Sequence, residues 1–406
     1  MNLQKKKTAS MDCYDFIVAH IDETTRCYQK EWALHPTLIP LPYPYTVPCA
    51  NGGFQEMYYW DTYFTNKGLI LIEKINQAVN NVKNLIYLLK KYKKIPNGSA
   101  THYLERSQPP FLGLMLKDVL KTSKEITVTE AYEALKIEYN FWTSQRNTAN
   151  GLNRYYCDNA FEQEELEATL KLYEARTGIM LEKTKENARS VYAEAESGWD
   201  FSPRFQSECS NYNPVDLNCL LYADEVLLSQ WANELGLIDE SKTYEQSAEN
   251  RKALVKELMK HDGIYYDWNF VKKTHSDCIS CASLFPYFVG IDNDKNDFKK
   301  AIEHLEYNYG LVAAKDNRTI FQWAEPNAWA PLQYIAVEAA NLIGCKNIAD
   351  RLRKKYLMAT ETLFNETGRL WEKYNAITGG LDVSSEYGTP EMFGWAAGVY
   401  VYFKKF

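Results

Sequence analysis

The chain has 406 residues, of which 46% are hydrophobic and 24% are charged, an ordinary balance for a soluble globular protein. Its formal net charge is -7, which argues against nucleic acid and anionic membrane surfaces as main partners. No stretch approaches the roughly 20 apolar residues that a membrane span needs. We therefore expect neither a nucleic-acid-binding protein nor a membrane-embedded one.

The cysteines and the N-terminus predict a cytoplasmic location. Lys5-Lys6-Lys7 gives a basic start, but no apolar segment follows it, so it does not read as a secretory signal. The 9 cysteines are scattered and odd in number, which favours reduced thiols. Cys278 and Cys281 have the spacing of a redox or metal pair, yet no second pair or nearby His pair accompanies them. Buried helix residues are the better interpretation, and no metal or cofactor is expected.

The first half of the chain predicts a series of helices. Residues 1–40 are expected to be a helical lead-in, and the prolines at 40, 42 and 44 then exclude a helix. Helices are predicted over 58–74, 76–92 and 128–142, and another begins after 106–111. The pattern is clearest over 76–92, where one apolar stripe has helical spacing: Val79, Val82, Leu85, Ile86, Leu89 and Tyr92.

The second half continues in the same way. The charged run 162–189 is helical in composition and is interpreted as a solvated insertion. Further helices are predicted over 213–231, 244–259, 278–288, 297–307, 331–343, 347–364 and 393–403, with a short hairpin at 261–268. Little strand is expected, so the sequence predicts an all-α protein. Helical hairpins in series suggest a closed helical barrel.

One segment, residues 195–204, holds an aspartate between two aromatic rings. Gly198 permits backbone conformations that a side chain would forbid. Trp199 and Phe201 can shield the Asp200 carboxyl from water, and desolvation favours the protonated form of an acid. A protonated carboxyl beside a wet cleft can donate the proton that glycosidic bond cleavage needs. The alternative is an ordinary aspartate that caps a helix.

Three further segments follow a recognisable order with this one. They are Phe54-Gln55-Glu56-Met57-Tyr58-Tyr59-Trp60-Asp61, then residues 322–331, and then Glu386-Tyr387 with Phe393-Gly394-Trp395. Together the four segments resemble the trehalases of glycoside hydrolase family 37, from about Leu41 to the C-terminus. The resemblance implies an (α/α)6 toroid with its active site on the loops at one mouth. It also implies a lead-in at 1–40 and a single catalytic domain at 41–406.

The resemblance implies a metal-free, inverting glycosidase that cleaves α,α-trehalose to two glucose molecules. An inverting enzyme needs one carboxyl as general acid and another as general base on the opposite face of the sugar. The general acid of the family falls on Asp200 and the general base on Glu386. Asp382 and Glu391 are the nearest alternatives for the base.

Other matched positions are expected to bind the sugar. For Asn97, Arg106 and Gln108 the alternative is capping and loop bracing, and for the two later tryptophans it is a place in the core. Glu372 also matches and is expected to be structural. The predicted sugar-binding residues are Phe54, Tyr58, Trp60, Asp61, Asn97, Arg106, Gln108, Glu165, Gly198, Trp323 and Trp329.

This chain departs from the family pattern at two positions where the family has a positively charged arginine. The family has an arginine after the two glycines where this chain has Phe54 following Gly52-Gly53. Counting from Asn153 places Gln163 where the family has a second arginine, while Glu165 keeps the glutamate. The reaction type is therefore a safer prediction than the substrate. Two alternatives stay open: another α-linked glucoside or modified disaccharide, and a sugar-binding protein without activity. No oligomeric state is predicted.

Overall fold

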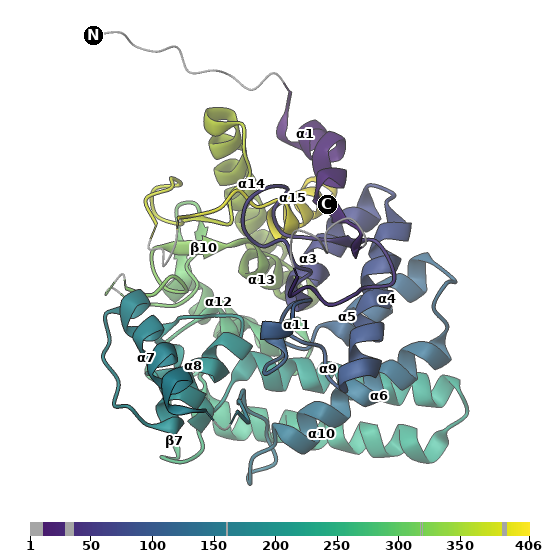
Figure 1. Cartoon of the computed structure of the whole chain (residues 1–406), viewed down its shortest axis with the longest axis vertical. Helices are drawn as coiled ribbons and strands as arrows, with labels where there is room; N and C mark the ends of the chain where they lie inside the picture. Colours follow the sequence, from purple (N-terminus) through teal and green to yellow (C-terminus); the bar gives the residue numbers. More distant parts are fainter. Residues whose placement is uncertain (1–10, 29–35, 160, 317, 319, 384–387) are drawn as a thin grey trace.

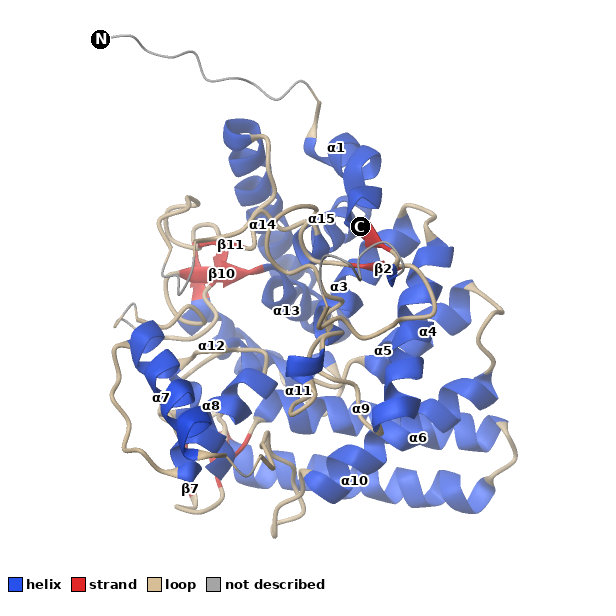
Figure 2. Cartoon of the chain, viewed as in Figure 1, coloured by secondary structure: helices blue, strands red, loops and turns tan. Residues whose placement is uncertain are grey.

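The computed structural model describes residues 11–28, 36–159, 161–316, 318, 320–383 and 388–406. Within these ranges helices dominate and the strands are short, as Figure 2 shows. The all-α class predicted from the sequence is confirmed. Among the described helices, none combines the length and the apolar character that crossing a bilayer requires.

Six helices of the described chain form a closed ring in which each packs on the next and the last packs on the first. The ring follows chain order, so α15 lies beside α3 although the two stand near opposite ends of the chain (Figure 1). Helices α3, α13 and α15 are buried on almost all sides. The six are α3 (Tyr59–Leu71), α5 (Leu112–Thr122), α9 (Val215–Glu234), α11 (Phe285–Phe288), α13 (Ala330–Leu342) and α15 (Gly394–Lys405).

A second set of helices covers the outside of this ring. Helix α10 packs on α9, α14 packs on α13, and α4 packs on α3 and α5. Each outer helix buries one stripe; in α14 it includes Ile348, Leu352, Tyr356 and Leu363, at the spacing of one helical face. The two layers make the (α/α)6 toroid that was expected. The outer helices are α1 (Cys13–His20), α4 (Ile75–Tyr92), α6 (Val128–Gln145), α10 (Ile238–Met259), α12 (Lys295–Leu305) and α14 (Lys346–Thr367).

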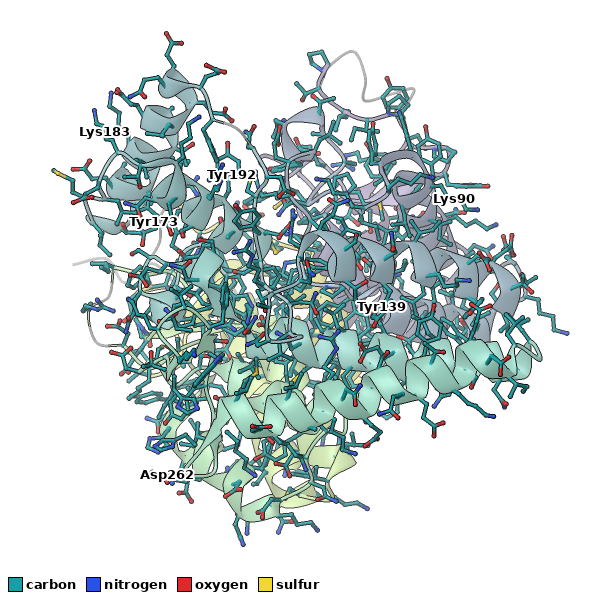
Figure 3. The ribbon with its side chains drawn as sticks, turned by 90° about the horizontal axis from the view of Figure 1, so that it is seen from below. Lys90, Tyr139, Tyr173, Lys183, Tyr192 and Asp262 are labelled. Carbon is teal, nitrogen blue, oxygen red and sulfur yellow. The ribbon has the colours of Figure 1, made fainter. Side chains whose placement is uncertain are left out.

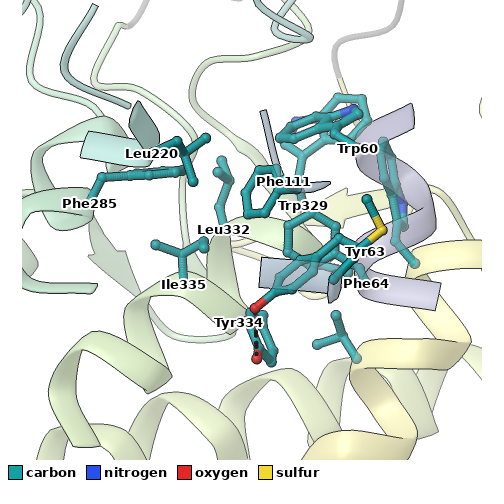
Figure 4. Packing of buried hydrophobic residues seen from close by; sticks show 14 of the residues in the cluster. Trp60, Tyr63, Phe64, Phe111, Leu220, Phe285, Trp329, Leu332, Tyr334 and Ile335 are labelled. Atoms are coloured by element: carbon teal, nitrogen blue, oxygen red, sulfur yellow. Dashed lines mark hydrogen bonds between the residues drawn. The ribbon is translucent and has the colours of Figure 1, made fainter. Parts of the chain in front are cut away.

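Aromatic side chains fill the inside of the ring, so the barrel is a packed core (Figure 4). The Tyr63 ring stacks on Phe111 with 4.7 Å between centroids, and the Tyr63 hydroxyl lies 3.4 Å from that of Tyr334. These three residues come from α3, from the start of α5 and from α13. The interior therefore ties together helices that are distant in sequence.

An additional helical hairpin lies between α6 and α9 in the chain, formed by α7 (Gln163–Thr177) and α8 (Lys185–Glu196). The expectation of a solvated insertion at 162–189 is wrong for one face of this hairpin. Leu166, Leu170 and Tyr173 from α7 and Val191 from α8 are buried in a hydrophobic cluster of their own. The high charge of the segment hid this apolar stripe.

The short strands pair antiparallel and brace the loops. In the pair β10 (Asn327–Trp329) and β11 (Lys373–Asn375), Trp329 stands opposite Lys373. The hairpin predicted at 261–268 is present as β4 (Lys260–His261) and β5 (Ile264–Tyr265). The others are β1 (Thr25–Arg26), β2 (Tyr45–Thr46), β3 (Tyr212–Asn213), β6 (Trp268–Asn269), β7 (Thr274–His275), β8 (Glu306–Tyr307) and β9 (Gly310–Leu311).

The helix predicted from residue 278 begins three residues later in the structure, at Cys281. The helix predicted over 278–288 begins as the 3-10 helix η5 (Cys281–Leu284) followed by α11, because the Ser280 hydroxyl accepts the Ala282 N–H and caps the start. The division of the chain at residue 40 stays a prediction; α1, which lies before it, packs on α14 and α15.

The contact between α3 and α15 has no room for side chains at one point. A Cβ on Gly398 would lie 2.1 Å from the carbonyl oxygen of Phe64 and 3.0 Å from the Cα of Thr65. A Cβ on Gly68 would in turn lie 2.6 Å from the Cα of Gly398. Because these neighbours are backbone atoms, they cannot move aside without shifting a helix.

We expect Gly398→Ala to destabilise the protein by about 1–3 kcal/mol, since overpacking a tight contact outweighs the better helix propensity of alanine. Urea unfolding followed by circular dichroism measures the change. The matched control is Gly53→Ala, because Gly53 is exposed and a Cβ there meets nothing within 4 Å. A Gly398→Ala protein as stable as the control would contradict the expectation.

Candidate active site

A cavity of about 250 Å³ opens at the end of the ring where α3, α13 and α15 begin. Helix N-termini carry partial positive charge from their unpaired N–H groups, which suits carboxylates and hydroxyl oxygens. The cavity is lined by Phe54, Tyr58, Trp60, Asp61, Asn97, Tyr103, Arg106, Gln108, Arg176, Ala195, Gly198, Asp200, Gln322, Trp323, Trp329, Glu372, Met392 and Trp395.

The segment after α8 fixes the position of Asp200. Gly198 has a φ of +74°, and a Cβ there would lie 3.0 Å from Cε2 of Trp60, so both conformation and space favour glycine. The rings of Trp199 and Phe201 are both buried. The helix-capping alternative does not hold, because Ser202 is the residue that caps the 3-10 helix η3 (Pro203–Phe205).

Burial raises the pKa of Asp200 to about 6, and the positive charges of Arg176 and Arg106 hold it below what burial alone would give. The Arg176 Nη1 atom lies 3.9 Å from Asp200 Oδ2, and the two side chains are 30% and 35% exposed. Burial also raises the pKa of Asp61, to about 8, with a further increase from the charges of Glu372 and Asp200. The site thus holds carboxyls that stay protonated into the pH range where free aspartate is ionised.

Tryptophan rings form one wall of the cavity. Trp323 and Trp329 stack face to face with 3.8 Å between centroids and 4° between planes. Trp60 lies 5.7 Å from Trp323, and Trp395 meets both Trp60 and Trp329 edge-on at 5.9 Å. The Trp329 indole donates to the Gln322 carbonyl and the Trp395 indole to that of Glu372, so the rings are held in fixed orientations. Rigid aromatic faces of this kind suit the C–H faces of sugars.

A buried ion pair supports the backbone of Asp200 through one glutamine. Lys373 Nζ lies 2.7 Å from Glu372 Oε2 and donates to Gln322 Oε1 at 3.2 Å. The Gln322 amide nitrogen in turn donates to the Asp200 carbonyl oxygen at 2.6 Å. Glu372 therefore combines the structural role expected of it with a place in the cavity wall.

Polar residues of the 97–108 loop face the cavity while they brace the loop. Gln108 Oε1 accepts the backbone N–H of Trp60 at 3.1 Å in the first turn of α3. The Asn97 amide donates to the carbonyls of Ser107 and Ala195, each at 3.4 Å. The Arg106 guanidinium lies over the Tyr103 ring. These residues therefore brace the loop, as the alternative interpretation expected, and they also line the cavity.

The structure brings most of the predicted residues to this cavity and leaves some outside it. Glu386 and the residues next to it, 384–387, lie outside the described residues. Glu165 is on α7, where it accepts a hydrogen bond from Asn159, and it does not line the cavity. The two alternatives for the base also lie away from the lining: Asp382 accepts from Thr378, and Glu391 pairs with Arg369.

The sequence predicted no sugar-binding role for seven of the lining residues: Tyr103, Arg176, Ala195, Gln322, Glu372, Met392 and Trp395. Ala195, Gln322 and Trp395 stand inside the segments that carry the family resemblance, so their neighbours gave a signal. Arg176 gave none, because it stands in a charged helix and outside every matched motif.

Comparison with known proteins gives the family. A family model described as trehalase matches residues 6–406. The chain is 32% identical over 397 residues to a periplasmic trehalase of Xanthomonas oryzae pv. oryzae, covering 90% of this chain and 68% of the relative. It is 31% identical to a periplasmic trehalase of Pseudomonas aeruginosa, covering 97% and 77%. It is 30% identical to a trehalase of Homo sapiens, covering 90% and 68%.

Solved structures show the same fold. Neutral trehalase Nth1 from Saccharomyces cerevisiae superposes with a TM-score of 0.77 and 26% identity, covering 97% of this chain and 80% of the other. A mannosylglycerate hydrolase from Thermus thermophilus has a TM-score of 0.60 at 16% identity, covering 89% of this chain and 95% of the other, and shares the fold alone.

These relatives correct one sequence expectation. The predicted cytoplasmic location is wrong, because the bacterial relatives are named periplasmic trehalases. The unpaired cysteines were a poor guide to the cellular compartment. All but Cys27 are buried, and a buried thiol acts as a small apolar side chain whose presence reflects packing. Cys278 and Cys281 are both buried as expected, but Cys278 lies before the helix and only Cys281 is a helix residue, at the start of η5. On the strength of the family match over nearly its whole length, the chain belongs to the trehalase family.

Proposed function

We propose that the protein hydrolyses α,α-trehalose to two glucose molecules with inversion of configuration. Membership of the trehalase family and the names of the relatives support trehalose as the substrate. One observation carries the proposed reaction: the Asp200 carboxyl lines a tryptophan-walled cavity, and burial raises the pKa of this carboxyl. A small sugar is the proposed ligand of that cavity.

In the proposed mechanism Asp200 is the general acid. Its carboxyl gives a proton to the glycosidic oxygen as the bond from that oxygen to the anomeric carbon breaks. A water molecule attacks the opposite face of the anomeric carbon, and a second carboxylate takes the proton from that water. We propose Glu386 for this base on the resemblance of its motif alone.

The lining residues fit the two needs of a sugar. Trp60, Trp323 and Trp329 offer apolar faces, and Phe54 and Tyr58 extend the aromatic surface. Asp61, Asn97, Arg106 and Gln108 offer hydrogen-bonding groups at the same cavity. We propose these residues, with Gly198 giving close approach of the backbone, as the substrate-binding set.

Replacement of the acid tests its role. Asp200→Asn keeps the shape of the side chain but removes the transferable proton, so we expect kcat for glucose release from trehalose to fall by about 10²–10⁴-fold. The control is Asp262→Asn, because the Asp262 side chain is 82% exposed on the outer surface. Near-native turnover by Asp200→Asn, with circular dichroism unchanged, would remove Asp200 from the mechanism.

The pH dependence follows from the same carboxyl. A general acid acts only while protonated, and the pKa of Asp200 is raised to about 6. We therefore expect kcat/KM, which reports the free enzyme, to fall with a slope of about tenfold per pH unit once the pH passes about 6. Initial rates in buffers of constant ionic strength measure the profile. A basic limb that begins near pH 4 would show that an unperturbed aspartate controls it.

The stereochemistry of the products tests inversion. Inverting hydrolysis of α,α-trehalose releases one β-glucose and one α-glucose, whereas retention releases α-glucose only. Proton NMR of the anomeric signals, recorded before mutarotation, is expected to show both anomers in equal amounts. The same enzyme assayed on other α-linked disaccharides distinguishes trehalose from the alternative substrates. Early spectra with α-glucose alone would refute inversion.

A further inference from the structure

One face of the α7–α8 hairpin packs on the segment that carries Asp200. Its hydrophobic cluster includes Phe201 and Phe321, which are the chain neighbours of Asp200 and Gln322. The Tyr173 ring of α7 meets the Phe201 ring edge-on with 4.8 Å between centroids. Figure 3 shows the hairpin at one side of the molecule, with Tyr173, Tyr192 and Lys183 labelled.

Arg176 is carried to the cavity by this attachment. It follows Tyr173 by three residues, so both side chains lie on the same face of α7. Tyr173 is anchored on Phe201, and its hydroxyl lies 2.6 Å from the Ser207 hydroxyl. Arg176 therefore lies at the cavity, with Nη1 3.9 Å from Asp200 Oδ2.

The other guanidinium of the cavity also depends on the hairpin. Arg106 lies between two rings, with its central carbon 5.2 Å from the Tyr103 centroid and 5.4 Å from that of Tyr192. Tyr192 belongs to α8. The hairpin thus supplies one arginine to the cavity directly and orients a second.

We infer that Arg176 is a substrate-binding residue, delivered by the α7–α8 hairpin to hydrogen-bond hydroxyl oxygens of the sugar that Asp200 protonates. This inference rests on the proposed function. A guanidinium has five N–H donors in a rigid fork, so it can contact the carboxyl and a sugar hydroxyl together.

A role in stability alone does not account for this placement. An ion pair whose side chains are each about one-third exposed contributes little to stability. The buried cluster around Tyr173 already holds the hairpin in place. Arg176 is instead placed where a bound sugar and the acid meet.

The test compares Arg176→Gln and Arg176→Lys with Lys171→Gln, which removes a charge from an exposed position on the same helix. Loss of a hydrogen bond from a charged donor is expected to raise KM for trehalose, and Kd from quenching of tryptophan fluorescence, by about 10–100-fold in Arg176→Gln. The basic limb of kcat/KM should also move to higher pH, because the Arg176 charge lowers the pKa of Asp200. Arg176→Lys should keep the wild-type limb with an intermediate KM, and Lys171→Gln should match wild type.

The outcomes separate the two proposals. If wild type releases glucose from trehalose and Arg176→Gln keeps its KM, Kd and pH limb, the inference is overturned and the proposed function stands. If Arg176→Gln loses only thermal stability and kcat, with Kd and the pH limb unchanged, Arg176 is a brace and the inference is again overturned. If wild type neither cleaves nor binds trehalose, the proposed function falls and this inference falls with it.

Discussion

The packing of α15 on α3 is the contact on which the other parts of the site depend, because it joins the two ends of the ring. Because Gly398 and Gly68 have no side chains, the two helix backbones approach so closely that a Cβ on either residue would clash with the other helix. That approach sets Trp395 against Trp60, and through them the stacked pair Trp323 and Trp329. The tryptophan wall is therefore a product of ring closure rather than of any one loop.

Charge balance in the cavity is set by competition between burial and two arginines. Burial drives Asp200 and Asp61 toward the protonated state, while Arg176 and Arg106 favour the ionised form of Asp200. Glu372 is balanced separately by Lys373. Two carboxyls can thus differ in protonation although they share a cavity, since the arginine charges lower the pKa of Asp200 whereas the charges of Glu372 and Asp200 raise that of Asp61.

Much of the fold could be predicted because its signals are local. The stripe in α4 and the caps and breakers between helices depend on residues close in sequence. The motif around Gly198 and Asp200 pointed by resemblance to residues that line the cavity in the structure. Arg176 could not be found in this way, because its place depends on a tertiary contact between Tyr173 and Phe201. Counting from Asn153 placed Glu165 among the sugar-binding residues. In the structure Glu165 lies on α7, and its carboxylate accepts a hydrogen bond from Asn159 instead. Buried cysteines gave a misleading signal of compartment.

Closure of the ring by its last helix has a consequence for biosynthesis. The surface of α3 that receives α15 is buried in the folded protein, and it leaves the ribosome long before α15 is made. Until then the nascent chain exposes that surface, and contacts between segments so distant in sequence form slowly. Folding of the complete barrel must therefore follow the synthesis of α15, and a chaperone that covers α3 in the interval would protect the chain from aggregation.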